Sequence, residues 1–247
     1  MGLWLRIRLG SRLLRRAALF AVGIASLAKL GSAGMLMGSM LVSLALYAWA
    51  FGWRFAVGLI VVLFVHELGH VIAAYVVGLR PSVPVFVPFV GAVISLRQPP
   101  RSAKMAANVA VGGPAVGTLS ALLFLAGYFW TDSILLLVLA YTAAIINLFN
   151  LIPLAPLDGG RIAAAILPYM WGWGGFIAAG VFFYTRNLIV LVIFVISLYY
   201  LWKGEDMNNR DNYYALSLHR RFKVACWYFG LVSVLGIVMI YAGSILY

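Results

Sequence analysis

His66-Glu67-Leu68-Gly69-His70 lies in the middle of an apolar stretch, from residue 55 to residue 77, whose flanking residues contain nothing charged. A stretch of this length predicts a helix that crosses a membrane, because the hydrocarbon core of a bilayer needs about 20 apolar residues. On a helix, the two histidines of an H-E-x-x-H pattern lie one turn apart on the same face. The pattern therefore predicts two imidazoles that reach the same point inside a membrane.

Two histidines at this spacing can bind one zinc ion. Glu67 then lies beside the open coordination position, where its carboxylate can take a proton from the bound water. The alternative is a buried group of side chains that only satisfy one another. Ionisable residues are costly within a membrane and usually mark a functional site there, which favours the zinc interpretation.

The composition of the whole chain indicates a polytopic membrane protein. Of the 247 residues, 65% are hydrophobic and 10% are charged, which is more apolar surface than a soluble domain of this length can bury. The net charge of +12 does not indicate nucleic-acid binding, because the basic residues flank hydrophobic segments as they do in cytoplasmic loops. The single cysteine excludes an internal disulfide and a thiolate zinc cluster, so histidines and carboxylates must hold any metal.

We expect an all-α fold of about six to seven transmembrane helices. With the N-terminus inside, 16 of the 18 basic residues lie on the inner side and only Arg54 and Arg186 lie outside. This asymmetry satisfies the positive-inside rule and places the expected active site toward the cytoplasm. The predicted spans are residues 32–52, 54–77, 103–130, 133–152, 161–184, 188–202 and 224–245.

The segments outside these spans complete the predicted organisation. Residues 1–31 are basic, and their apolar part is too short to span, which predicts an interfacial helix on the inner leaflet; a targeting peptide is the alternative. Residues 32–203 form the membrane core, residues 204–223 a cytoplasmic loop and residues 224–247 the last transmembrane helix. Pro168 and the glycine-rich sequence that follows it predict a kink or break within the span 161–184.

Prolines at positions 81, 84, 88, 99 and 100 exclude a continuous helix between residues 80 and 104. Apolar residues alternate on both sides of Gly91, which predicts a β-hairpin at about residues 81–100. Irregular backbone at membrane depth needs a cover of protein or a water-filled cavity. An extended peptide could add a strand to the edge of such a hairpin, although a plain interfacial loop is the alternative.

A catalytic zinc usually has three protein ligands and a water, so the two histidines need a third partner. The other acidic residues after Glu67, and His219, lie in a predicted outer turn or in the polar inner loop. Asp158 is different, because it adjoins helices on the same side as the hairpin. Prolines unwind the backbone before it, and Gly159-Gly160 allow a sharp turn after it. Asp158 is the candidate third ligand, but D-G-G is also an ordinary turn in which the aspartate only caps a helix.

These motifs together resemble the site-2 protease family of intramembrane zinc metalloproteases. The resemblance rests on H-E-x-x-H at residues 66–70 and on N-x-x-P-x-x-P-L-D-G-G at residues 150–160. Gly112-Gly113-Pro114-Ala115-Val116-Gly117 resembles the glycine-proline motif of the family's middle core helix, in which Asn often stands at the last of these positions. Residues 84–92 resemble the family's β-loop.

The resemblance covers about residues 34–200 and implies a three-helix catalytic core of the compact type without a PDZ or CBS domain. It implies that His66, His70 and Asp158 hold one catalytic zinc ion. Glu67 would be the general base that activates the zinc-bound water, and Asn150 would orient the substrate or stabilise the oxyanion. The substrate would be a transmembrane helix of another protein, unwound at the site and cut near the inner face of a membrane, which we expect to be a prokaryotic plasma membrane.

Two other functions stay open at this point. A transporter or channel could use the same ionisable residues as a metal or proton path, although the two halves of the chain show no inverted repeat. A pseudoprotease could hold substrate helices without cutting them, although such proteins usually lose the glutamate or a ligand, and this chain keeps all four groups.

Overall fold

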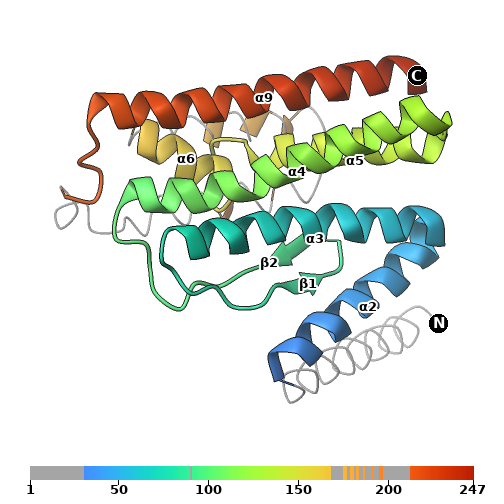
Figure 1. Cartoon of the computed structure of the whole chain (residues 1–247), viewed down its shortest axis with the longest axis horizontal. Helices are drawn as coiled ribbons and strands as arrows, with labels where there is room; N and C mark the ends of the chain where they lie inside the picture. The colour runs from blue at the N-terminus through green and yellow to red at the C-terminus, as the bar shows by residue number, and fades with distance from the viewer. Residues whose placement is uncertain are drawn as a thin grey trace, which may run out of the picture.

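The structure is a computed structural model that describes residues 31–89, 91–167 and 212–247, with isolated positions between 175 and 196. In these parts the chain is mostly helical, with a small two-stranded sheet on one side of a helix bundle (Figure 1). The helices are α2 (Gly31–Phe51), α3 (Trp53–Val76), α4 (Ala103–Thr131), α5 (Ile134–Asn150), α6 (Asp158–Ile166) and α9 (Leu218–Leu246), and the strands are β1 (Val85–Val87) and β2 (Gly91–Val93).

Four of the described helices, α2, α3, α4 and α9, are long and apolar enough to cross a membrane. Helix α5 is also apolar and has 17 residues. These helices agree with five of the seven predicted spans, which supports a polytopic membrane protein. The predicted span 188–202 and most of 161–184 lie outside the described residues, so the total number of crossings stays a prediction. The predicted interfacial segment 1–31 also lies outside them, except for Gly31 at the start of α2.

Helix α9 begins at Leu218, inside the segment that we predicted to be a loop as far as residue 223. The basic residues there suggested a solvated loop, but one of them has partners within the protein. The Arg221 guanidinium donates hydrogen bonds to the carbonyl oxygens of Leu216, Ile166 and Tyr214, at 3.2, 2.7 and 3.0 Å. These contacts join the start of α9 to the end of α6.

Helix α6 ends at Ile166, and Leu167 has an extended backbone. A residue before a proline is pushed out of the helical region by the proline ring, so the helix ends where Pro168 predicts. The predicted break in the span 161–184 therefore begins at this point.

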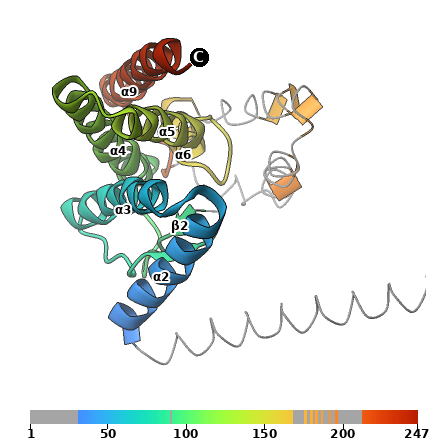
Figure 2. The same ribbon diagram turned by 90° about the vertical axis from the view of Figure 1, so that its right-hand side faces the viewer.

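The predicted β-hairpin is confirmed. β1 and β2 pair antiparallel, with Val85 opposite Val93, Phe86 opposite Ala92 and Val87 opposite Gly91. Phe86 is 3% exposed and belongs to an apolar cluster with residues of α2 and α3. Figure 2 shows the hairpin beside α2 and α3, on the side of the bundle away from α9.

Helix α4 lies at the centre of the bundle and contacts α3, α5, α6 and α9. It approaches α3 closely because glycines meet at the crossing. A Cβ atom on Gly69 would overlap the carbonyl oxygen of Gly112, and one on Gly112 would overlap the side chain of Ala73. Small residues let helix backbones pack closely in a membrane. The crossing places the H-E-x-x-H pattern of α3 against the glycine-proline motif of α4.

Candidate metal centre

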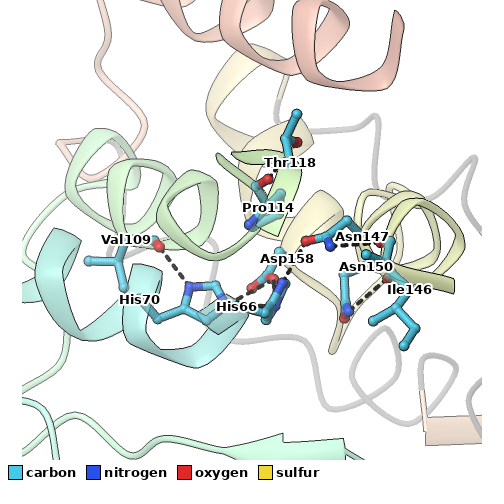
Figure 3. Close-up of polar contacts among 10 residues, drawn as sticks. His66, His70, Val109, Pro114, Thr118, Ile146, Asn147, Asn150 and Asp158 are labelled. Carbon is cyan, nitrogen blue, oxygen red and sulfur yellow. Dashed lines mark hydrogen bonds and ion pairs between the residues drawn. The ribbon is translucent and has the colours of Figure 1, made fainter. Parts of the chain in front are cut away.

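The structure brings the two histidines of α3 together with Asp158, the first residue of α6 (Figure 3). His66 Nε2 lies 3.4 Å from Asp158 Oδ2, and His70 Nε2 lies 3.1 Å from the same oxygen. The two Nε2 atoms are 3.2 Å apart. His66 and Asp158 are buried, and His70 is partly buried. Three residues from two distant motifs therefore form one compact cluster.

The spacing of these three atoms fits a zinc ion. Zinc bonds of about 2.0–2.1 Å in a tetrahedral arrangement place neighbouring ligand atoms about 3.3 Å apart. The observed separations are 3.1, 3.2 and 3.4 Å. Three ligands on one face of a tetrahedron leave the fourth position open for water or substrate, as catalytic zinc sites require.

The second ring nitrogen of each histidine faces a carbonyl oxygen. His66 Nδ1 lies 2.8 Å from Asn147 Oδ1, and His70 Nδ1 lies 2.8 Å from the carbonyl oxygen of Val109 (Figure 3). A carbonyl oxygen only accepts hydrogen bonds, so both Nδ1 atoms donate, and in the neutral imidazole each Nε2 atom then presents a lone pair. Two lone pairs and a carboxylate directed at one point repel one another without a cation between them. The donor set fits a divalent metal for this reason.

Asp158 lies in the first turn of α6 and does not act as its cap, because the N-cap position is Leu157. The Asp158 carboxylate faces the histidines instead. The turn before it packs tightly: a Cβ atom on Gly159 would overlap the carbonyl oxygen of Leu151, and one on Gly160 would crowd the backbone of Ala155. The glycines that follow the aspartate therefore let α6 begin against the segment that leads into it.

Glu67 is buried in α3 next to His66. It lies close enough to both histidines and to Asp158 for electrostatic interaction with all three. The predicted general base is therefore buried on the same helix as the two predicted histidine ligands.

Asn150 lies near the end of α5, and its Nδ2 donates to the carbonyl oxygen of Ile146 at 3.0 Å. Among the described residues, its side chain makes no hydrogen bond to the two histidines or to Asp158. The substrate-orienting role of Asn150 stays a prediction.

The asparagine that contacts the cluster is Asn147, one turn earlier on α5. It was not among the residues predicted from the sequence. Its side chain is fully buried, and its Nδ2 donates to the carbonyl oxygen of Ala143 at 2.8 Å, which directs Oδ1 toward His66. The sequence signal for Asn147 is an amide one turn before Asn150, in a helix whose other residues are mostly apolar.

The glycine-proline motif of α4 provides space for the cluster. A Cβ atom on Gly113 would overlap His70 Nε2, and one on Gly117 would overlap Asn147 Oδ1. Thr118 Oγ1 donates to the carbonyl oxygen of Pro114 at 2.7 Å (Figure 3). This face of α4 therefore has no side chain where the histidine and the amide lie.

The comparison with protein families agrees with this arrangement. The family model of Peptidase family M50 matches residues 54–134, which include the H-E-x-x-H pattern, the hairpin and the glycine-proline motif. The resemblance to the site-2 protease family that we predicted from the motifs is confirmed.

Two relatives are similar over a larger part of the chain. Zinc metalloprotease MJ0392 of Methanocaldococcus jannaschii is 33% identical over 113 residues, which is 44% of this chain and 32% of the relative. Rip3 of Mycobacterium tuberculosis, described as a candidate zinc metalloprotease, is 35% identical over 132 residues, which is 50% of this chain and 32% of the relative. The matched region therefore spans about a third of the length of these curated relatives.

Proposed function

We propose that this chain is a zinc-dependent intramembrane metalloprotease that hydrolyses a peptide bond within or near a transmembrane helix of another membrane protein. The observation that carries the proposal is the cluster of His66, His70 and Asp158 ligand atoms, located between helices that are apolar enough to span a membrane. The similarity to zinc metalloproteases supports zinc as the metal.

The zinc ion, Glu67 and Asn150 have different roles in the proposed reaction. When bound, a zinc ion polarises the scissile carbonyl and makes water a stronger nucleophile near neutral pH. Glu67 takes the proton of the attacking water and later delivers it to the nitrogen of the leaving amine. Asn150 contacts the substrate or the developing oxyanion, after its amide exchanges the hydrogen bond to Ile146 for one to the substrate.

The hairpin offers a place for an unwound substrate segment. One edge of β1 is already occupied, because the backbone N–H group of Phe86 donates to Ser39 Oγ of α2 at 3.1 Å. In the turn after β1, the backbone N–H group of Phe89 donates to Tyr47 Oη of α2 at 3.0 Å. The backbone N–H of Phe86 therefore points away from β2. In an antiparallel pair the backbone groups of the residue opposite, Ala92, then also point away from β1. We assign the edge of β2 that faces away from β1 as the place where an extended substrate peptide pairs.

The proposed setting is a prokaryotic plasma membrane, with the lipid bilayer around the helices and the site toward the cytoplasm. The distribution of basic residues supports this orientation. The substrate helix enters from the bilayer, and the bond that is cut lies near the inner face.

A comparison of membranes from cells that express the wild-type chain or Glu67→Gln tests the proposal. Membrane proteins are labelled at their N-termini and identified by mass spectrometry. We expect new N-termini within apolar segments with the wild-type chain and none of them with Glu67→Gln, although both proteins contain the same amount of zinc by elemental analysis. Identical sets of N-termini would overturn the proteolytic function and return the transporter and the pseudoprotease to consideration.

A further inference from the structure

We propose that Asn147 is a positioning residue of the metal centre, and that Gly117, which has no side chain, leaves room for the Asn147 amide. The amide oxygen fixes the orientation of the His66 ring and keeps the ring proton on Nδ1. This inference rests on the proposed function, because it concerns how the same site holds its metal.

The Asn147 side chain is held at both ends. Its Nδ2 donates to the carbonyl oxygen of Ala143 on the same helix, and its Oδ1 accepts from His66 Nδ1, both at 2.8 Å. The residue is 0% exposed, so no bulk water can replace either partner. A buried amide is costly unless it is hydrogen-bonded. The Ala143 bond therefore sets which end of the amide faces the histidine.

The two histidines differ in what orients them. His70 Nδ1 donates to a backbone carbonyl, that of Val109 on α4, which no substitution at that position removes. His66 Nδ1 donates to a single side chain on α5. Without Asn147, the His66 proton has no acceptor at that site, and the ring can rotate or carry its proton on Nε2. Either change removes the lone pair that His66 directs at the metal.

Gly117 and Asn147 face each other across the contact between α4 and α5. A Cβ atom on Gly117 would overlap Oδ1, Cγ and Nδ2 of Asn147. Because all three amide atoms are close, a small shift of the amide does not relieve the overlap. The amide at position 147 therefore fits only when position 117 is a glycine, so the two positions are coupled.

The first test measures the affinity of the purified, detergent-solubilised chain for zinc by competition with a chelator. Asn147→Leu removes the acceptor at similar volume, and we expect it to weaken zinc binding by about 10- to 100-fold. Asn147→Asp keeps an oxygen acceptor for His66, and we expect it to restore most of the affinity. Wild-type affinity in a folded Asn147→Leu variant would overturn the inference.

Thr142→Val is the matched control. Thr142 lies on the same helix, and its Oγ1 donates to the carbonyl oxygen of Val138 at 2.7 Å, four residues earlier, as Asn147 Nδ2 does to Ala143. The control loses the same kind of helix hydrogen bond without touching a histidine. We expect wild-type zinc affinity for Thr142→Val; a loss equal to that of Asn147→Leu would reduce Asn147 to a structural role and overturn the inference.

A double-mutant cycle tests the coupling with Gly117. We expect Gly117→Ala alone to weaken zinc binding, since its Cβ displaces the amide. In the Asn147→Ala background the amide is absent, so adding Gly117→Ala should cost little more affinity. Independent, additive losses would show that the two positions do not act as a pair.

The absorption spectrum of the cobalt-substituted protein gives a second readout that needs no substrate. We expect the Co²⁺ bands of Asn147→Leu to differ from those of the wild type, because the bands report ligand geometry, and those of Thr142→Val to be unchanged. A wild type that binds zinc but cuts nothing would refute the proposed function and leave this inference intact. An Asn147→Leu variant that binds zinc and cleaves like the wild type would refute this inference and leave the proposed function intact.

Discussion

The candidate metal centre has two halves that the chain builds in different ways. The half on α3 supplies His66, Glu67 and His70 from one regular helix, so their relative positions follow from helix geometry alone. The half after α5 supplies Asp158 from the first turn of α6, whose position depends on the packing of Gly159 and Gly160 against the preceding backbone. One half is local, and the other is assembled by tertiary contacts.

This difference predicts different responses to substitution. Changes in the α3 half remove chemistry and leave the fold in place. Changes around the Asp158 half move a ligand by moving backbone, so they alter stability and metal binding together. The following experiments separate these two responses.

The largest effect is expected for Asp158→Ala, which removes the single ligand of the assembled half. Two histidines alone hold zinc weakly, so we expect the zinc content to fall from about one ion per chain to background and cleavage to be lost with it. Elemental analysis of the purified protein measures this directly. An Asp158→Ala variant that retains stoichiometric zinc would show that the two halves do not meet at one ion.

Glu67→Gln is expected to affect only the chemistry of the local half. The amide has nearly the same shape as the carboxylate but cannot accept the proton of the attacking water, so cleavage should fall by about 10²- to 10⁴-fold. Zinc content and thermal stability should stay near those of the wild type. Cleavage at the wild-type rate would exclude Glu67 as the general base.

The same contrast explains how much the sequence could predict. The H-E-x-x-H cluster and the apolar helices depend on periods and lengths that are visible in a single sequence. The hairpin is likewise predictable, because prolines exclude a helix and apolar residues alternate around Gly91. Asp158 was found as a candidate by its place between prolines and glycines, but its distance from the histidines needs the tertiary structure.

Asn147 shows where prediction from the sequence ends. Its amide lies one turn from that of Asn150, and nothing in the spacing indicates which of the two faces the histidines. The answer depends on how closely α4 and α5 approach, which Gly117 permits only at one of them. The start of α9 is a second example, because Arg221 donates to one carbonyl group 55 residues away, that of Ile166, as well as to two near neighbours.

Gly159→Ala is expected to disturb the assembled half without removing any functional group. The new Cβ atom would overlap the carbonyl oxygens of Leu151 and Ile152, and overpacking of this kind costs about 1–3 kcal/mol. We expect a lower melting temperature and weaker zinc binding in the same variant. Gly230→Ala on α9 is the control, because a Cβ atom there meets nothing within 4 Å; an equal loss in both variants would contradict a specific role of the turn.

The smallest effect on zinc binding is expected for Tyr228→Phe, which tests whether α9 supports the Asp158 half. The Tyr228 hydroxyl donates to the carbonyl oxygen of Leu151 at 2.7 Å, and both groups are buried. Removing the donor leaves this carbonyl without that partner and should lower the free energy of unfolding by about 1–3 kcal/mol. Thermal unfolding with and without added zinc measures the change.

The matched control for this variant is Tyr241→Phe on the same helix, at a residue that is 40% exposed and packs against the ring of Phe129. We expect no change in unfolding there. Leu151 begins the segment that leads from α5 to Asp158. Tyr228→Phe should therefore also reduce zinc affinity slightly, while Glu67→Gln should not. A loss of stability in Tyr228→Phe with unchanged zinc affinity would mean that Asp158 keeps its position without the contact from α9. The position of Asp158 would then depend on the neighbouring backbone alone.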